Sequence, residues 1–273
     1  MSARKLDQFY TKSSIAIKCY NLIKQTVDID KYLLIEPSAG LGAFSNQFHS
    51  NSYALDLEPK HKNIIKQDFF DFDLNNPKND KIITIGNPPF GKNSSLAIKF
   101  FNKSAEYSDY ICMIFPITFK KDSVINKLNK SFKLIDEVVL EKNSFIFDDT
   151  DYDVKCVFQI WKKSTTERGL IPQKKETKYF CFVKKNTTPD FAIRRVGGLA
   201  GKVIEEYSKY KEPSHYFINI NTEYIKNKDL IIDVLKKSYK LFNHQAQYSV
   251  GNPSLSKHEL ITILEKELKK VLK

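Results

Sequence analysis

The sequence predicts an α/β fold, a Rossmann-like sheet with helices on both faces, followed by a small C-terminal α+β region. Short apolar runs that end in an acidic or amide side chain recur along the first half of the chain. Segments with amphipathic helical spacing separate several of them. A polar stretch with Gly and Pro then interrupts this pattern. We therefore expect a larger domain over residues 1–162, a linker over 163–177 and a smaller domain over 178–273.

Composition narrows the class of protein. The chain has 273 residues, of which 41% are hydrophobic. It has no run of about 18 or more apolar residues and no signal-peptide apolar region at its start, so we expect a cytoplasmic protein without a membrane partner. The four cysteines are scattered, three of them in apolar runs, and the five histidines are dispersed. We expect reduced thiols in an intracellular compartment and no bound metal.

The charge points to the kind of partner. The net charge is +12 and the isoelectric point is near 9.3. Such a balance favours a polyanionic partner, and nucleic acid is the commonest. Most of the basic residues are lysines, which also fits an AT-rich coding sequence, so the charge is a supporting observation only.

The first part of the chain predicts three strand ends in succession. A helical pattern follows Ser13 or Ser14, and the strand Tyr32–Ile35 leads into residues 36–44, Glu-Pro-Ser-Ala-Gly-Leu-Gly-Ala-Phe. A strand, a turn with two glycines and a helix start bring free backbone N–H groups close to a ligand. About 20 residues later Asp56 ends a second strand, where an acid can accept hydrogen bonds from a ribose. A third strand end, 64–70, offers Asp68 to an adenine amino group and Phe69 to its ring.

A fourth strand end carries the most distinctive motif. The apolar run Ile82–Ile85 stops at Gly86 and is followed by Asn87-Pro88-Pro89-Phe90. The prolines lack N–H groups and fix φ, so the backbone there is rigid. The Asn87 side-chain oxygen and the Pro88 carbonyl can each accept one hydrogen of a planar NH2 group, while Phe90 stacks on its ring system. The alternative is a rigid turn without chemistry.

The remaining elements complete the α/β pattern. In the first domain we expect helices over 96–107 and 120–130 and strands over 110–116, 134–140 and 154–161. In the second we expect strands over 179–183, 191–196 and 216–220 and helices over 199–210 and 229–242. Ser256 and Glu259 form a capping-box pattern that opens a last helix.

Taken together, these motifs resemble the S-adenosylmethionine-dependent N6-adenine DNA methyltransferases, in the gamma-type motif order. The resemblance covers about residues 7–162 and begins with Asp-Gln-Phe-Tyr-Thr at 7–11. It implies a class I methyltransferase sheet, S-adenosylmethionine as cofactor, and Asn87, Pro88, Pro89 and Phe90 as catalytic residues. The cofactor-binding residues that it implies are Phe9, Thr11, Glu36, Pro37, Ala39, Gly40, Gly42, Phe44, Asp56, Leu57, Asp68, Phe69 and Asn87.

Substrate-binding residues are predicted in two places. The family often places an aromatic residue before its closing hairpin, against the flipped base, which selects Phe147 and then Phe145. A buried hairpin aromatic is the alternative for both. Arg194 and Arg195 lie beside three glycines and suit phosphates or guanine edges. A tight turn with a solvated pair of arginines explains the same residues.

The expected function is methyl transfer from S-adenosylmethionine to the N6 amino group of adenine in DNA, as in restriction–modification or other DNA methylation. Three alternatives remain open. The same chemistry applies to adenine in RNA. Protein-glutamine methyltransferases carry a similar Asn-Pro-Pro sequence, usually with Tyr where this chain has Phe90. A non-catalytic subunit that binds nucleic acid is the third alternative.

Overall fold

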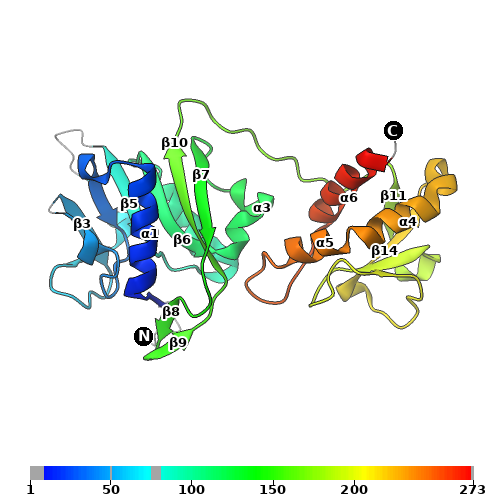
Figure 1. The fold of residues 1–273 in the computed structure, drawn as a ribbon, viewed down its shortest axis with the longest axis horizontal. Helices are drawn as coiled ribbons and strands as arrows, with labels where there is room; N and C mark the ends of the chain where they lie inside the picture. The colour runs from blue at the N-terminus through cyan, green and yellow to red at the C-terminus, as the bar shows by residue number, and fades with distance from the viewer. Residues whose placement is uncertain (1–8, 50, 75–80, 272–273) are drawn as a thin grey trace. The chain divides into compact units, whose positions relative to one another are not determined.

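The computed structural model describes residues 9–49, 51–74 and 81–271, in two compact units, Met1–Ile171 and Pro172–Lys273 (Figure 1). The division falls inside the predicted linker, 163–177. Both ends of that linker pack on their own unit: the Arg168 guanidinium donates to the Leu128 carbonyl at 2.6 Å, and the Lys174 backbone N–H donates to His258 at 3.0 Å. The first two residues of the 7–11 motif lie outside the described residues.

The first unit is built on a sheet in the order β4-β3-β2-β5-β6-β10-β7. The first five of these strands are parallel, and β10 lies antiparallel between β6 and β7. This order and these directions are those of the class I methyltransferase sheet, so the predicted fold class is confirmed. The chain adds strands on one side of β2 and then on the other, which makes the β2–β5 boundary the switch point where such sheets bind ligands. The bounds are β2 Leu33–Glu36, β3 Ser52–Asp56, β4 Ile65–Lys66, β5 Ile82–Gly86, β6 Tyr110–Pro116, β7 Phe132–Val139 and β10 Cys156–Lys163.

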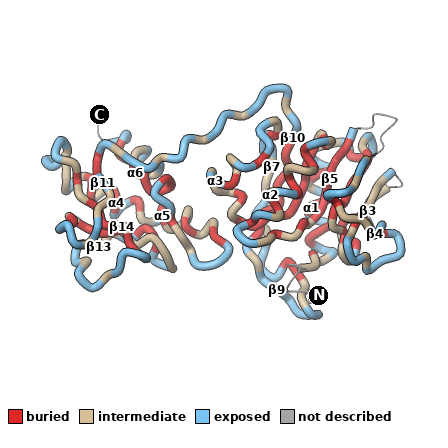
Figure 2. The backbone as a smooth tube through the Cα atoms, turned by 180° about the vertical axis from the view of Figure 1, so that it is seen from behind, coloured by how far each residue is buried: buried red, intermediate tan, exposed pale blue. Residues whose placement is uncertain are grey.

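Helices cover both faces of this sheet. Every residue of β2, β5 and β6 is buried, which is typical of parallel strands covered on two sides (Figure 2). Two of the covering helices are α1, Ser13–Thr26, and α2, Ser95–Ser104, seen on opposite sides in Figures 1 and 2. The α1 helix begins where the serines predict, but its N-cap is Lys12 and makes no side-chain capping bond.

A second, three-stranded sheet joins the start of the described chain to a later hairpin. It pairs β1, Tyr10–Thr11, with β8, Phe145–Phe147, and β8 with β9, Thr150–Tyr152. Asp148 and Asp149 form the hairpin turn with φ of +47° and +57°. Two successive left-handed residues are typical of the type I′ turn, which matches the twist of hairpin strands.

Two expected helices of this unit are much shorter than predicted. Residues 45–47 form a single 3-10 turn, and the region expected as one helix over 120–130 holds the end of a 3-10 turn and a four-residue helix, α3, Asp122–Ile125. Asn126 follows α3 at once, and its side chain exchanges two hydrogen bonds with the Ile171 backbone, at 2.8 and 2.9 Å. These two bonds tie the residue that follows α3 to the segment that follows β10.

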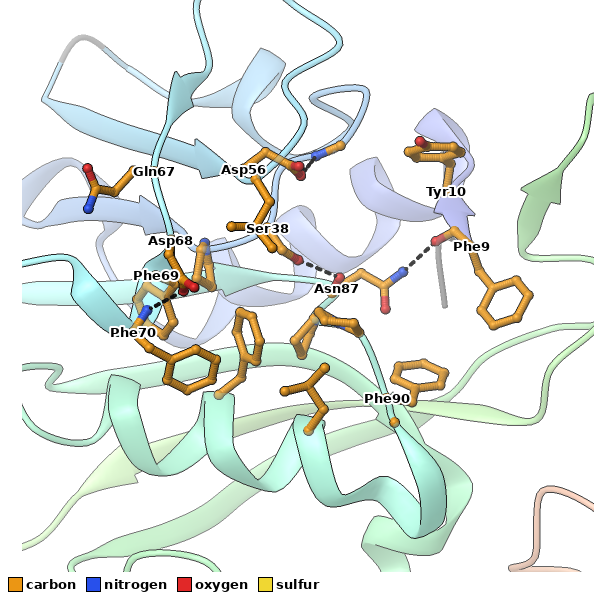
Figure 3. Close-up of a pocket in the computed structure, with 18 of the residues that line it drawn as sticks. Phe9, Tyr10, Ser38, Asp56, Gln67, Asp68, Phe69, Phe70, Asn87 and Phe90 are labelled. Atoms are coloured by element: carbon orange, nitrogen blue, oxygen red, sulfur yellow. Dashed lines mark hydrogen bonds between the residues drawn. The ribbon is translucent and has the colours of Figure 1, made fainter. Parts of the chain in front are cut away.

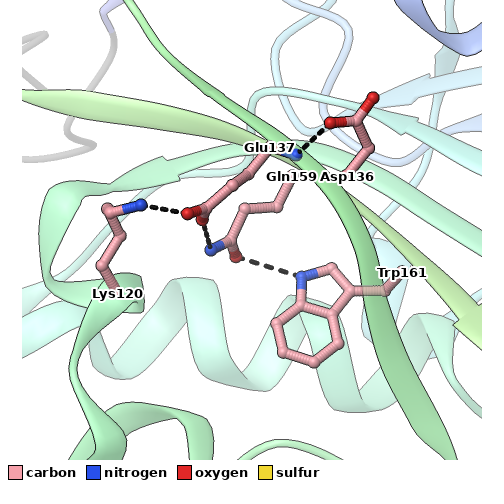
Figure 4. Close-up of polar contacts among 5 residues, drawn as sticks. All are labelled: Lys120, Asp136, Glu137, Gln159 and Trp161. Carbon is pink, nitrogen blue, oxygen red and sulfur yellow. Dashed lines mark hydrogen bonds and ion pairs between the residues drawn. The ribbon is translucent and has the colours of Figure 1, made fainter.

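A buried polar network ties β10 to β7 (Figure 4). The fully buried Gln159 side chain donates to Glu137 at 2.9 Å and accepts from the Trp161 indole N–H at 3.0 Å. Glu137 also forms an ion pair with Lys120, which follows β6 along the chain. Because each polar group has a partner, the network holds the edge of the sheet in one arrangement.

The second unit is a small α+β domain, as predicted. Its antiparallel sheet has the order β11-β14-β12-β13, and its apolar core includes Phe180, Phe191, Ile218 and Leu264. The predicted capping box is confirmed: the Ser256 N–H donates to the Glu259 carboxylate at 2.7 Å, and the Glu259 N–H donates to the Ser256 hydroxyl at 3.2 Å. The bounds are β11 Phe180–Val183, β12 Phe191–Arg194, β13 Val203–Ile204, β14 His215–Ile220, α4 Lys228–Lys237, α5 Tyr239–Ala246 and α6 Lys257–Val271.

One helix predicted in this unit is absent and another is divided. Residues 199–210, expected as a helix, form turns and the short strand β13. Gly201 has φ of +94°, and a Cβ there would lie 2.3 Å from the Cβ of Phe242. The close approach of this distant residue requires a left-handed turn, which a helix does not allow. The helix expected over 229–242 breaks at Ser238, between α4 and α5.

Candidate active site

A cavity of about 540 Å³, within the size range typical of ligand sites, opens beyond the carboxyl ends of β2, β3 and β5 (Figure 3). The predicted site residues that line it come from five separate motifs, so the fold brings these motifs together. They are Phe9, Pro37, Gly40, Asp56, Leu57, Asp68, Phe69, Asn87, Pro88, Pro89 and Phe90.

Asn87 stands directly after β5 and has an unusual set of hydrogen bonds. Its side-chain Nδ2 donates to the Phe9 carbonyl at 3.0 Å, and its backbone carbonyl accepts from the Ser38 hydroxyl at 3.0 Å. Its Oδ1 is buried and has no partner among the described residues. Figure 3 shows the bond of its Nδ2 to Phe9. A buried acceptor without a donor costs about 1–3 kcal/mol. This acceptor is therefore available to a ligand that carries an N–H or O–H group.

The Pro-Pro-Phe turn is locked onto the start of α2. The Phe90 carbonyl accepts from the backbone N–H groups of Leu96 and Ala97, at 3.1 and 3.2 Å. Gly91 has φ of +67°, and a Cβ at this position would lie 2.8 Å from the Leu96 Cβ. The turn needs glycine there, and the resulting contacts fix the Phe90 ring at the cavity wall.

The glycine loop after β2 differs from the prediction in one respect. Its backbone N–H groups were expected to be free for a ligand, but Gly40 donates to Asp56 Oδ2 at 2.7 Å and Gly42 donates to the Ala39 carbonyl at 2.7 Å. Asp56 takes the first N–H because it ends the neighbouring strand, β3. Gly40 is still required for close approach, since a Cβ on its φ of +52° would lie 2.9 Å from the Tyr10 ring.

Two aspartates give the cavity its acceptors. Asp56 also accepts from the Glu58 N–H at 2.8 Å, and Asp68 accepts from the Phe70 N–H at 2.8 Å while it caps the 3-10 turn Phe69–Asp71. A carboxylate has about four acceptor positions. Both side chains therefore keep acceptor capacity for a ligand, and their ribose and adenine roles stay predictions.

Glu36 lies behind the cavity wall. Its carboxylate accepts from the Ser45 N–H at 2.8 Å, and only 2% of the residue is exposed. Burial raises the pKa of Glu36 to about 8, and the negative charge of Asp56 adds to this effect. Glu36 therefore holds a proton near neutral pH unless a positive charge comes close.

Five predicted cofactor residues do not line the cavity. Thr11 lies in β1 and the other four lie at or after the end of β2, and all of them are buried, so they support the residues that form the wall. The five are Thr11, Glu36, Ala39, Gly42 and Phe44.

Several lining residues were not predicted. Tyr10 lies in the 7–11 motif and Ser38 in the 36–44 motif, so position in the motif was the available signal. Leu96 and Phe100 lie four residues apart on α2, and this spacing resembles that of an ordinary core-facing helix. The full set that was missed is Tyr10, Ser38, Gln67, Phe70, Gly91, Lys92, Leu96 and Phe100.

The predicted substrate residues have different surroundings. Phe147 does not line the cavity, but its ring lies 5.8 Å from the ring of Phe9, which does. Phe145, the second choice, is fully buried and lies against the core. Arg194 and Arg195 belong to the second unit: Arg194 donates to the Val196 carbonyl at 3.0 Å, and the Arg195 guanidinium lies 5.3 Å from the Tyr216 ring centre.

Residues 9–49, 51–74 and 81–271 offer neither a metal site nor a membrane-spanning helix. This part of the chain contains no group of three His, Cys, Asp or Glu side chains placed to hold a metal ion. None of its helices has the length and apolar character needed to cross a membrane.

Among known proteins, this chain is similar to solved structures only in its fold. No protein-family model matches the chain, and no curated protein sequence matches it. A putative RNA methyltransferase from Pyrococcus horikoshii is 18% identical, with a TM-score of 0.47 over 58% of this chain and 88% of that one. A modification subunit of a putative type I restriction enzyme from Vibrio vulnificus is 14% identical, with a TM-score of 0.42 over 57% and 45%. The 23S rRNA methyltransferase ErmE is 9% identical, with a TM-score of 0.40 over 94% and 98%. The fold assignment therefore rests on the strand order of the sheet.

Proposed function

We propose that this protein transfers a methyl group from S-adenosylmethionine to the N6 amino group of adenine in DNA. The observation that carries the proposal is the buried, unpartnered Oδ1 of Asn87 at the wall of the cavity. An exocyclic amine supplies the missing donor. Its second hydrogen faces the carbonyl of Pro88, which follows in the same rigid turn.

The residues of the turn hold the amine and change its geometry, and the proton that the amine loses goes to solvent. When bound, S-adenosylmethionine supplies an electrophilic methyl group on a sulfonium. Asn87 Oδ1 and the Pro88 carbonyl draw the amine nitrogen from planar toward tetrahedral, which frees its lone pair for attack. These hydrogen bonds strengthen as positive charge grows on the nitrogen, so they stabilise the transition state most. Because Asn87 is not a base, the proton that the nitrogen loses passes to water.

The cavity fits this cofactor at the level of donors and acceptors. Asp56 and Asp68 keep acceptor positions for two ribose hydroxyls and for an adenine amino group. Phe69 lies at the wall and stacks on Phe100, with ring centres 5.3 Å apart, so an adenine would meet an aromatic surface. A sulfonium near Glu36 would favour loss of the proton that burial retains there.

The distribution of charge supports a nucleic-acid substrate. Residues 172–273 carry 20 Lys and Arg against 11 Asp and Glu, a net charge of +9 within the total of +12. Residues 1–171 therefore carry +3. A strongly basic second unit, in a chain whose first unit is nearly neutral, is what a separate polyanion-binding region would require. Adenine in a duplex must be flipped out to reach Asn87.

One observation favours a second candidate function, methylation of a protein glutamine. The hairpin that carries Phe147 also carries Asp148, Asp149, Asp151 and Asp153, and its aromatic side chains contact Phe9 at the cavity wall. Aspartates at this position suit a cationic protein segment better than a phosphate backbone. The net charge of +12 argues for nucleic acid, so we rank this function second.

Transfer of a labelled methyl group to four substrates tests the proposal. Duplex DNA, single-stranded DNA, RNA and a mixed protein extract are each incubated with the protein and labelled S-adenosylmethionine, and the product is identified by mass spectrometry. We expect N6-methyladenine in DNA. N6-methyladenine in RNA alone would move the function to the first alternative, and label in protein alone would reject adenine as the substrate.

A further inference from the structure

We propose that the β1–β8–β9 sheet holds the Asn87 side-chain amide in the one orientation that methyl transfer needs, and that Tyr152 is a positioning residue for this purpose. The proposal goes beyond the proposed function but rests on it for its meaning in catalysis. It begins from the Phe9 carbonyl, which takes the Asn87 Nδ2–H at 3.0 Å.

That single bond decides which end of the amide is presented to the substrate. A carbonyl accepts only a donor, so Nδ2 must face Phe9 and Oδ1 must face the other way. If the amide turned over, its NH2 group would meet the NH2 group of the substrate, and two donors cannot bond. The position of the Phe9 backbone therefore selects the active rotamer of Asn87.

The Phe9 backbone is held in turn by the hairpin. The Phe9 ring stacks on Tyr152 with ring centres 4.7 Å apart and planes 5° from parallel, and it touches Phe147 at 5.8 Å. The next residues, 10 and 11, pair with β8, and the Lys12 N–H donates to the Ser144 carbonyl at 3.1 Å. Within the described chain β1 pairs with β8 alone, so the hairpin supplies the strand pairing that holds this segment beside Asn87.

A substitution at Tyr152 should weaken the hold on the Phe9 backbone and leave the rest of the fold in place. Tyr152 is 38% exposed, so its replacement leaves the core intact. The Tyr152 hydroxyl has no hydrogen bond among the described residues. The flat ring is thus the useful part of the side chain. We expect Tyr152→Phe to behave like wild type, Tyr152→Leu to be intermediate, and Tyr152→Ala to lower kcat by roughly tenfold, the upper end of what a stacked aromatic pair contributes.

Steady-state kinetics and NMR on the full chain test the proposal together. The kinetics compare kcat, KM and cofactor Kd for wild type, the three Tyr152 variants and Asp149→Asn, a matched change in the same hairpin that leaves the Phe9 contacts in place and suits a left-handed turn. NMR follows the Asn87 side-chain NH2 signal, assigned by its loss in Asn87→Ala. In wild type one amide hydrogen should exchange slowly with water and shift little with temperature. We expect Tyr152→Ala to raise both the exchange rate of this hydrogen and the temperature dependence of its chemical shift. The cofactor Kd should stay within about twofold of wild type because the cofactor acceptors are untouched.

The outcomes separate this proposal from the proposed function. An Asn87 amide signal that is the same in wild type, Tyr152→Ala and Tyr152→Leu would overturn the positioning role, whatever the protein methylates. An amide that responds in a protein that methylates no adenine would uphold the positioning role and reject the proposed function. If Tyr152→Ala does not fold, the comparison of Tyr152→Leu with Tyr152→Phe decides, and equal kcat values in these two would overturn the proposal.

Discussion

Two turns of this molecule look alike in sequence and differ in their hydrogen bonds. The Asn87–Gly91 turn follows β5, and the Arg194–Gly201 turn begins at the end of β12; each contains a polar side chain and a glycine with positive φ. In the first, Asn87 Oδ1 is buried without a partner. In the second, Arg194 donates to the Val196 carbonyl of its own turn. A polar residue with glycines at a strand end is therefore common to both turns, and so is an unpartnered atom, since Arg195 Nε is also buried without a partner. What marks the first turn is that its unpartnered atom belongs to a residue at the wall of the cavity.

The largest effect is expected from Asn87→Ala, which removes the unpartnered acceptor. We expect kcat for methyl transfer to fall by about a thousandfold, because the lost hydrogen bond acts mainly on the transition state. The cofactor Kd should stay within about twofold of wild type, since the ribose and adenine acceptors remain. Asn93→Gly is the matched control: Asn93 lies in the same region at φ of +55°, which glycine adopts without strain. Equal losses in both variants would contradict a special role for Asn87.

The next effect concerns stability, and it tests whether the second turn is structural. Gly201→Ala places a Cβ 2.3 Å from the Phe242 Cβ at φ of +94°, whereas a Cβ at Gly198 meets nothing within 4 Å. We expect Gly201→Ala to lower the free energy of unfolding by roughly 3 kcal/mol through overpacking and backbone strain. Gly198→Ala should change it by less than about 0.5 kcal/mol. Denaturant titration measures both, and similar values for the two variants would show that the turn is not packed as described.

A smaller effect depends on pH and concerns Glu36. Its pKa in the folded protein is about 8 and its usual value is 4.5. The folded state therefore keeps a proton that the unfolded state releases, so stability is greatest below the unfolded pKa and falls as pH rises toward 8. Between pH 6 and pH 7 wild type should lose about 1.4 kcal/mol relative to Glu36→Gln. Parallel pH profiles of unfolding free energy for the two proteins would contradict this account.

The smallest effect is expected at Arg194. Its hydrogen bond to Val196 contributes about 1 kcal/mol, so Arg194→Ala should lower the free energy of unfolding by that amount. The salt dependence of nucleic-acid binding should not change if the side chain serves only its own turn. If Arg194→Ala instead reduced the slope of log binding constant against log salt concentration by about 1, and left the free energy of unfolding unchanged, Arg194 would contact a phosphate as predicted.

The sequence predicts local features well and contacts between distant residues poorly. Asp56, Asp68 and Asn87 lie at strand ends as predicted, because apolar runs and the breakers after them are local signals. The Ser256–Glu259 capping box is equally local. The Gly201–Phe242 contact and the Asn87–Phe9 hydrogen bond are different, since their partners lie 41 and 78 residues away. No window of sequence contains both partners, and this is why the helix over 199–210 was wrongly predicted.

A double-mutant cycle on binding tests the central claim most directly. The DNA that the methyl-transfer assay identifies is made with adenine or with purine, which lacks the 6-amino group, at the target position. Binding of both to wild type and to Asn87→Ala is measured with the cofactor product present. The account predicts that wild type binds the adenine form more tightly and that Asn87→Ala reduces this preference about tenfold, the value of one buried hydrogen bond, because only the Pro88 carbonyl then accepts from the amine. An unchanged preference in Asn87→Ala would show that the Asn87 oxygen does not hold the amine.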